Sequence, residues 1–367
     1  MILEAVHVSD FPQRHDHIQE NATFSNFQGC FPRGGEEDQR LFPRMPTKFM
    51  IIGHRGSGMN MLQSSNPRMK SIKENTIISF NEAAKFNIDF IEFDVQVTKD
   101  GFPVIFHDIF IQTLNQGEII EKRVTELTLE EFLSYGPQED SLKVGKPLFR
   151  KTNDGQMFEW KVEMDDHLCT LEEVFQKVNH SLGFNIELKF DDKKDYTEDV
   201  LVHLLQLILQ VVNRYAKDRP IIFSSFHPDA AVLMRKLQTL YPVFFITKGG
   251  IEMFKDIRRN SLDEAIKLSL AGNLQGIVSE VKAILRNPSV VAKIRHSKLI
   301  LLTYGQLNNV PEVVCMQRLL GINGVIVDFV KEIANAVSDM NQTFEEGKEE
   351  ELFLLGKKIS EIDVVLK

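Results

Sequence analysis

The sequence contains few of the residues that mark secreted or membrane-spanning proteins. It has only three cysteines in 367 residues, at Cys30, Cys169 and Cys315. Three widely spaced thiols form neither a disulfide framework nor a cysteine-rich metal motif, so a reducing compartment is the simplest interpretation. No apolar run in the sequence reaches the roughly 18 residues that cross a bilayer, so no transmembrane segment is expected.

Positive charge is also in short supply. The 43 lysines and arginines are outnumbered by 52 aspartates and glutamates, which gives a formal net charge of -9. Nucleic-acid-binding proteins normally present a basic face, so we expect no nucleic-acid partner. An anionic small-molecule substrate stays open, because a bound metal ion can reverse the local sign of the charge.

The N-terminus lacks the basic segment that begins a secretory signal. Asp10, Asp16 and Glu20 also argue against an organelle transit peptide, which is normally poor in acidic residues. We therefore expect a cytoplasmic protein, with a plastid location as the alternative.

The periodicity of the chain predicts one folded domain with two extensions. Residues 1–47 hold neither a helical nor a strand period and are expected to form a flexible N-terminal arm. Residues 48–341 are expected to form the domain, with an insert at 112–166 that contains a small hairpin. Residues 342–367 are expected to form an acidic C-terminal tail with a possible helix.

Strand-like apolar runs alternate with amphipathic helical segments from residue 49 onward. The candidate strands are 49–53, 89–98, 104–107, 182–190, 220–226, 243–247, 276–279, 299–304 and 324–328. Such alternation predicts an α/β fold with a parallel sheet, and at this length a single-domain (β/α)8 TIM barrel. A barrel needs eight strands, so we expect one of 243–247 and 276–279 to lie outside the ring.

Polar groups follow the first three predicted strands. His54 and Arg55 end the first strand, Glu92 and Asp94 lie on the second, and His107 ends the third. The C-terminal ends of barrel strands form the active site of this fold, so these groups are expected to meet. The polar stretch 57–73 is long enough to be a functional loop over the barrel mouth.

Three carboxylates are predicted to point into the barrel. Glu92 and Asp94 are two residues apart, so both face the same side of their strand, and Glu187 lies on a later strand. Buried carboxylates are costly without a positive charge between them. Their chemistry favours a hard cation, Mg²⁺ first and Ca²⁺ as the alternative. Structural ion pairs of Glu92 with Arg55 and of Glu187 with Lys189 are the competing explanation.

The two histidines suit acid–base chemistry. A single histidine at a strand end is more often a hydrogen-bonded structural residue, but His54 and His107 lie beside the carboxylates and suit a general acid and a general base. The Arg55 guanidinium can hold a phosphate oxygen. Phe226 and Tyr304 end two later strands, where they can line a pocket wall or simply pack.

Taken together, these motifs resemble the glycerophosphodiester phosphodiesterases, especially the soluble plant-like branch. The matching motifs are His54-Arg55-Gly56, Glu74-Asn75-Thr76, Glu92-x-Asp94-Val95, His107-Asp108, Glu187-x-Lys189 and Ser225-Phe226. The resemblance implies a TIM barrel that hydrolyses glycerophosphodiesters such as glycerophosphocholine to sn-glycerol 3-phosphate and an alcohol, with a divalent metal.

The resemblance also implies roles for individual residues. Glu92, Asp94 and Glu187 would be metal ligands, His54 and His107 the acid–base pair, and Arg55 and Lys189 phosphate contacts. Phe226 and Tyr304 would contact substrate. One departure is that many bacterial members carry a W-T-V-N run where this chain has Thr303-Tyr304-Gly305.

Two other functions fit the same motifs. One is a lysophospholipase D activity on lysophospholipids, and the other is a barrel that binds phosphodiesters without turnover. In each case the expected partner is a small-molecule phosphodiester, and the sequence leaves the oligomeric state open.

Overall fold

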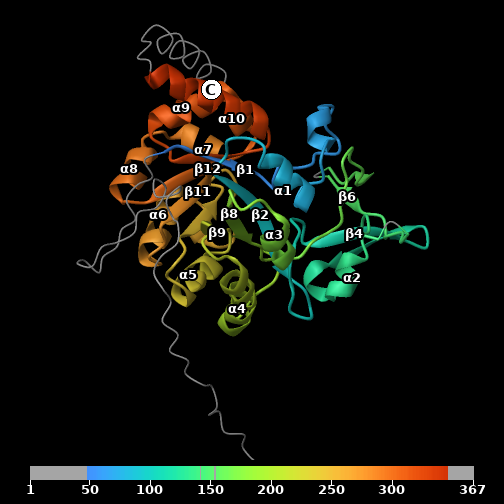
Figure 1. Ribbon diagram of the computed structural model, residues 1–367. Coiled ribbons are helices and arrows are strands. Elements are labelled where there is room, and N and C mark those ends of the chain that lie inside the picture. The colour runs from blue at the N-terminus through green and yellow to red at the C-terminus, as the bar shows by residue number, and fades with distance from the viewer. Residues whose placement is uncertain (1–47, 141, 153, 346–367) are drawn as a thin grey trace, which may run out of the picture.

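A computed structural model describes residues 48–140, 142–152 and 154–345 (Figure 1). The predicted arm at 1–47 and the end of the predicted tail, 346–367, lie outside the described residues. The last described element is helix α10, which runs from Val330 to Glu345.

Within the described residues, eight parallel strands close into a ring, which confirms the TIM barrel. The closure is visible in the pairing of β1 with both β13 and β2. The ring strands are β1 (Met50–Gly53), β2 (Phe90–Val97), β8 (Gly183–Leu188), β9 (Ile221–Ser225), β10 (Val243–Thr247), β11 (Gly276–Glu280), β12 (Ile300–Tyr304) and β13 (Gly324–Val327). They are buried almost throughout, as expected for parallel strands covered on both faces.

Helices surround the ring on its outer side (Figure 1). They are α1 (Ile77–Ala83), α3 (Leu171–Lys177), α4 (Glu198–Tyr215), α5 (Pro228–Leu237), α6 (Leu262–Ala271), α7 (Val281–Arg286), α8 (Val290–His296), α9 (Pro311–Leu320) and α10. Short 3₁₀ turns are η1 (Pro67–Lys70), η2 (Val124–Glu126), η3 (Ile257–Arg259) and η4 (Gln306–Asn309). The apolar faces of the helices pack on the ring in one continuous core.

Two predictions about the strands are wrong. The third predicted strand forms β3 (Pro103–Ile105), which pairs antiparallel with β2 and lies outside the ring. The connection from Val97 to Pro103 is a tight turn, and a parallel neighbour would need a crossover of a dozen or more residues. Both β10 and β11 therefore belong to the ring, although we expected one of them outside it.

The predicted insert forms a second, smaller sheet beside the barrel (Figure 1). Its strands are β4 (Phe110–Asn115), β5 (Glu118–Arg123), β6 (Phe149–Lys151) and β7 (Met157–Glu159), all antiparallel in the order β5-β4-β6-β7. The short helix α2 (Leu129–Leu133) packs with it, capped by Thr128. The inserted sheet has a core of its own, which includes Phe106, Phe132 and Trp160. The insert thus separates β2 from the ring strand β8.

Candidate active site

A cleft of about 1030 Å³ opens at the C-terminal ends of the ring strands. Eight of the nine predicted site residues line it, namely His54, Arg55, Glu92, His107, Glu187, Lys189, Phe226 and Tyr304. The ninth, Asp94, is buried, with 1% of its surface exposed. Met59, Met61 and Gln63 from the predicted mouth loop also line the cleft. The structure therefore brings the predicted residues together.

The three carboxylates converge because of strand register. Glu92 and Asp94 lie on β2, and Asp94 pairs directly with Glu187 on the parallel strand β8. Each residue offers an oxygen atom, and these atoms lie within 4.8 Å of one another. Such spacing suits a single cation held by oxygen ligands.

The electrostatics of the three carboxylates also favour a bound cation. Burial and the carboxylate of Asp94 raise the pKa of Glu92. Burial acts the same way on Asp94, but the Lys189 ammonium acts together with other nearby positive charges and the Asn75 hydrogen bond, so the pKa of Asp94 is lowered. Asp94 Oδ1 is buried and accepts no hydrogen bond, although Lys189 Nζ lies 3.4 Å away. A divalent cation would displace the proton that Glu92 otherwise holds.

The competing ion-pair explanation holds for only one of its two pairs. Lys189 Nζ contacts Glu187 Oε1 at 2.9 Å, as that explanation expects. The Arg55 side chain instead contacts Glu74 at 2.7 Å, and Glu92 accepts a hydrogen bond from the backbone nitrogen of Arg55 at 2.9 Å. In the described part of the chain, Glu92 has no ion pair with a lysine or arginine side chain.

His54 follows β1, and its ring is oriented by a carboxylate. Its Nδ1 lies 2.7 Å from Asp328 Oδ1, which also accepts a hydrogen bond from the backbone nitrogen of Met59. Its Nε2 is 4.0 Å from Glu92 Oε2. Removal from water disfavours the imidazolium, but the charge and the hydrogen bond of Asp328 together with the charge of Glu92 outweigh this effect, so the pKa of His54 is raised.

His107 follows β3 and has a similar partner with the opposite electrostatic result. Its Nδ1 lies 2.7 Å from Asp108 Oδ1. Burial, together with the positive charges of Arg55 and Lys189, lowers the pKa of His107. In both histidines the bonded Nδ1 leaves Nε2 for proton transfer. The pKa values of the two rings are therefore shifted in opposite directions.

Arg55 is held in an uncommon backbone conformation. Its φ is 49°, in the left-handed region, and its carbonyl oxygen accepts hydrogen bonds from Asn75 N and Ser79 Oγ. Its Nε is buried without a hydrogen-bond partner, 3.6 Å from Asp94 Oδ2. An unsatisfied buried donor of this kind is suited to an oxygen of a bound anion.

One wall of the cleft is aromatic. The rings of Phe226 and Tyr304 meet edge to face with 5.9 Å between their centroids. The Tyr304 hydroxyl lies 3.4 Å from the carbonyl oxygen of Thr247. Both residues therefore line the cleft as predicted.

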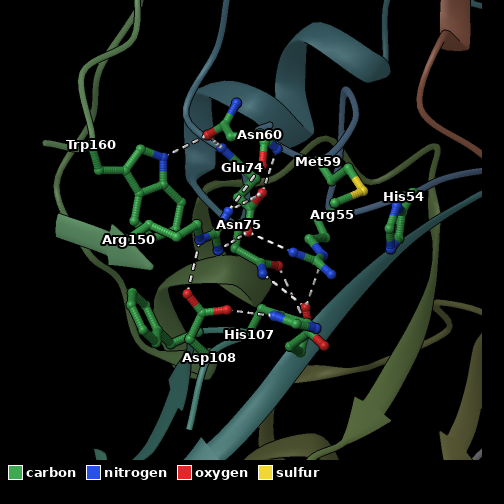
Figure 2. A network of polar contacts seen from close by, with 12 residues as sticks. His54, Arg55, Met59, Asn60, Glu74, Asn75, His107, Asp108, Arg150 and Trp160 are labelled. Atoms are coloured by element: carbon green, nitrogen blue, oxygen red, sulfur yellow. Dashed lines mark hydrogen bonds and ion pairs between the residues drawn. The ribbon is translucent and has the colours of Figure 1, made fainter. Parts of the chain in front are cut away.

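Several contributors to the site had no predicted role (Figure 2). Asp108 and Asn75 lie in the sequence motifs, whereas Asp328 follows β13. Asn75 Nδ2 donates to Asp94 Oδ2 at 2.9 Å. Arg150 and Trp160 come from the insert, and no local sequence pattern marks them.

The described residues contain no helix that is both long and apolar enough to cross a bilayer.

Comparisons with known proteins place this site in context. Residues 54–332 match the model of the glycerophosphoryl diester phosphodiesterase family. Glycerophosphodiester phosphodiesterase GDPD3 from Arabidopsis thaliana is 61% identical, over 87% of this chain and 87% of that protein. The chloroplastic GDPD1 from the same plant is 58% identical, over 93% of this chain and 90% of that protein.

The fold has a solved counterpart as well. A phosphodiesterase from Oleispira antarctica, determined in complex with the product sn-glycerol-3-phosphate, superposes with a TM-score of 0.55 at 20% identity. The match covers 79% of this chain and 96% of that chain.

Proposed function

This chain belongs to the glycerophosphoryl diester phosphodiesterase family, and from that premise we propose that it hydrolyses glycerophosphodiesters such as glycerophosphocholine with one bound divalent cation. The products would be sn-glycerol 3-phosphate and the free alcohol. The observation that carries this proposal is the meeting of three carboxylates and two oppositely tuned histidines in one cleft.

Glu92, Asp94 and Glu187 would hold the cation. Oxygen ligands alone suit Mg²⁺, with Ca²⁺ as the alternative. When bound, such an ion neutralises charge on a phosphodiester oxygen. Asp94 Oδ1 accepts no hydrogen bond, and the pKa of Glu92 is raised by burial beside the other carboxylates. A cation held by these oxygens would offset their negative charge, and this supports the assignment.

Arg55 and Lys189 would orient the phosphodiester. Arg55 Nε is buried beside the carboxylates without a hydrogen-bond acceptor, so it is available to a phosphate oxygen. Lys189 Nζ lies between Glu187 and Asp94, at 2.9 and 3.4 Å. It therefore places a fixed positive charge beside the position of the phosphate.

The two histidines divide the proton transfers. His54, whose raised pKa favours the imidazolium, would give a proton to the leaving alkoxide oxygen. His107, with its lowered pKa, stays neutral and would accept a proton from the attacking hydroxyl. That hydroxyl belongs either to water or to the glycerol of the substrate.

The aromatic wall favours a cationic alcohol group. Phe226 and Tyr304 present ring surfaces at the cleft, and a quaternary ammonium ion is attracted to such surfaces. Glycerophosphocholine, which carries choline, is therefore the first substrate to test.

The direct test incubates the full-length protein with glycerophosphocholine and Mg²⁺ and follows both products by ³¹P and ¹H NMR. We expect sn-glycerol 3-phosphate and choline in equal amounts. Lysophosphatidylcholine is assayed in parallel, and faster turnover of that lipid would favour the lysophospholipase D alternative. Binding of glycerophosphocholine without turnover in any divalent metal would contradict the proposal and favour a non-catalytic barrel.

We propose a cytoplasmic location, with the plastid as the alternative. The similarity to a relative named chloroplastic supports the alternative. A fluorescent fusion of the full chain in plant cells separates the two, because only a plastid protein coincides with chlorophyll fluorescence.

A further inference from the structure

Among the side chains of the inserted sheet that line the cleft, Arg150 of β6 contacts the groups around His107. Its Nε donates a hydrogen bond to Asp108 Oδ2 at 2.8 Å, and Nη2 donates to Glu74 Oε1 at 2.7 Å. Its Nη1 donates to Glu74 Oε2 and to the carbonyl oxygen of Asn60, each at 3.1 Å. The side chain is only 12% exposed. All three nitrogens of this buried guanidinium are therefore engaged.

Asp108 joins this arginine to His107. One of its carboxylate oxygens accepts from Arg150 Nε, and the other lies 2.7 Å from His107 Nδ1 (Figure 2). Burial raises the pKa of a carboxyl group, but the Arg150 charge and the hydrogen bonds from His107 and Arg150 together outweigh it and hold the pKa of Asp108 well below its usual range. The Asp108 carboxylate thus stays charged and accepts a hydrogen bond from the Nδ1–H group of the His107 imidazole.

Trp160 of the insert fixes the plane of the guanidinium. Its ring centroid lies 3.6 Å from Arg150 Cζ, which is the geometry of a cation–π stack. Its Nε1 donates to Asn60 Oδ1 at 3.0 Å. Trp160 belongs to the core of the inserted sheet, so Arg150 is anchored by the insert and not by the ring.

We propose that Arg150 is a positioning residue by which the inserted sheet, acting through Asp108, holds His107 in the tautomer with Nδ1 protonated and Nε2 free. The proposal rests on the proposed function, because it takes His107 as the residue that accepts a proton. Two other roles compete with it. Arg150 can act only as a tether between the insert and the barrel, or it can contact the phosphate of the substrate directly.

The first test compares R150Q with the matched variant R123Q. Arg123 also lies on the insert and pairs with Asp191, which follows the ring strand β8, but it does not contact the Asp108–His107 pair. We expect R150Q to lower kcat roughly 10- to 100-fold, which is typical when a residue that orients an active group is lost. We expect KM to change by less than about twofold and R123Q to keep near wild-type activity.

Two results of this comparison would overturn the proposal. Equal losses in R150Q and R123Q would show that Arg150 is only a tether. A higher KM with unchanged kcat would show that Arg150 binds substrate.

A double-mutant cycle tests whether Arg150 acts through Asp108. D108A removes the acceptor of both contacts, so adding R150Q to D108A should lower kcat by less than about twofold. If the two losses instead multiply, Arg150 acts by another route, such as Glu74, and the proposal is wrong.

A readout that is independent of turnover is the ¹⁵N NMR spectrum of the His107 ring. In the wild type we expect one tautomer with Nδ1 protonated, and in R150Q a mixture of both tautomers. An unchanged His107 tautomer in a folded R150Q protein would contradict the proposal. If R150Q does not fold, R150K takes its place. Lysine keeps the charge but lacks the planar fork of arginine, so we expect both His107 tautomers, with a smaller share of the second one.

Different results would contradict the proposed function and the role of Arg150. Full activity in H107A would contradict the proposed function itself. An inactive H107A beside an R150Q that behaves like R123Q would leave the proposed function standing and overturn only the role of Arg150.

Discussion

The ring and the inserted sheet contribute to the same site by different physical means. In the ring, Asp94 and Glu187 meet because β2 and β8 pair in parallel register, so the backbone alone fixes their distance. In the insert, Arg150 meets Asp108 only because a separate sheet with its own core docks beside the barrel mouth. The ring therefore sets where charge is held, and the insert sets how one charged group is oriented.

The two regions also differ in how deeply they are buried. Every residue of β2 is buried, whereas β5 of the insert is largely exposed. A substitution in the insert should therefore leave the barrel folded, and its effect on turnover can be measured without unfolding. If this difference matters, substitutions in the ring should affect turnover more than substitutions in the insert.

The largest effect is expected from the ring. Glu92→Gln removes one charged ligand from the carboxylate cluster and should lower kcat/KM on the order of 10³-fold or more, since the lost stabilisation acts at the reacting phosphate. Glu159→Gln, a partly exposed carboxylate of the insert, is the matched control and should change little. Similar losses in both variants would contradict the special role of the ring carboxylates.

The histidines should give a bell-shaped pH dependence of kcat/KM. His107 must be neutral, so activity falls as pH drops through its pKa, which lies below the usual value of 6.5. His54 must be protonated, so activity falls as pH rises through its pKa, which lies above 6.5. Each limb should approach about a tenfold change per pH unit. An acidic limb centred above pH 6.5 would contradict the assignment of His107, and a basic limb centred below pH 6.5 would contradict that of His54.

The smallest effect is expected from Trp160, the insert residue whose ring stacks on Arg150. Trp160→Phe keeps a ring beside Arg150 but removes the indole N–H that binds Asn60, so it should lower stability by about 1 kcal/mol. Turnover should fall only a few-fold, since the Arg150 contacts remain. Thermal melts and steady-state rates measure both quantities. Tyr135→Phe, in the same core, is the control and should leave turnover unchanged.

Much of the ring was predictable from the sequence because its rules are local. Alternating apolar runs located the ring strands, and the two-residue spacing of Glu92 and Asp94 placed both side chains on one face. Strand identity was harder, because 104–107 has the apolar composition of a ring strand while its turn to β2 makes it antiparallel. Local composition cannot distinguish these cases without the connection length.

The contribution of the insert was not predictable from the sequence. Arg150 lies 42 positions from Asp108 and 76 from Glu74, and no periodicity links these positions. The orientation of His54 by Asp328 spans 274 positions, which only closure of the ring brings together. Contacts of this kind depend on how whole elements dock, so residue spacing carries no signal for them.

The central claim is that Glu92, Asp94 and Glu187 bind the divalent cation that turnover requires. Its most direct test is calorimetric titration of Mg²⁺ into chelator-treated protein, with glycerophosphocholine turnover followed at each metal concentration. We predict one Mg²⁺ per chain, recovery of activity in step with binding, and loss of both in Glu92→Gln. Undiminished turnover after chelation, or Mg²⁺ binding by Glu92→Gln equal to that of the wild type, would contradict the claim.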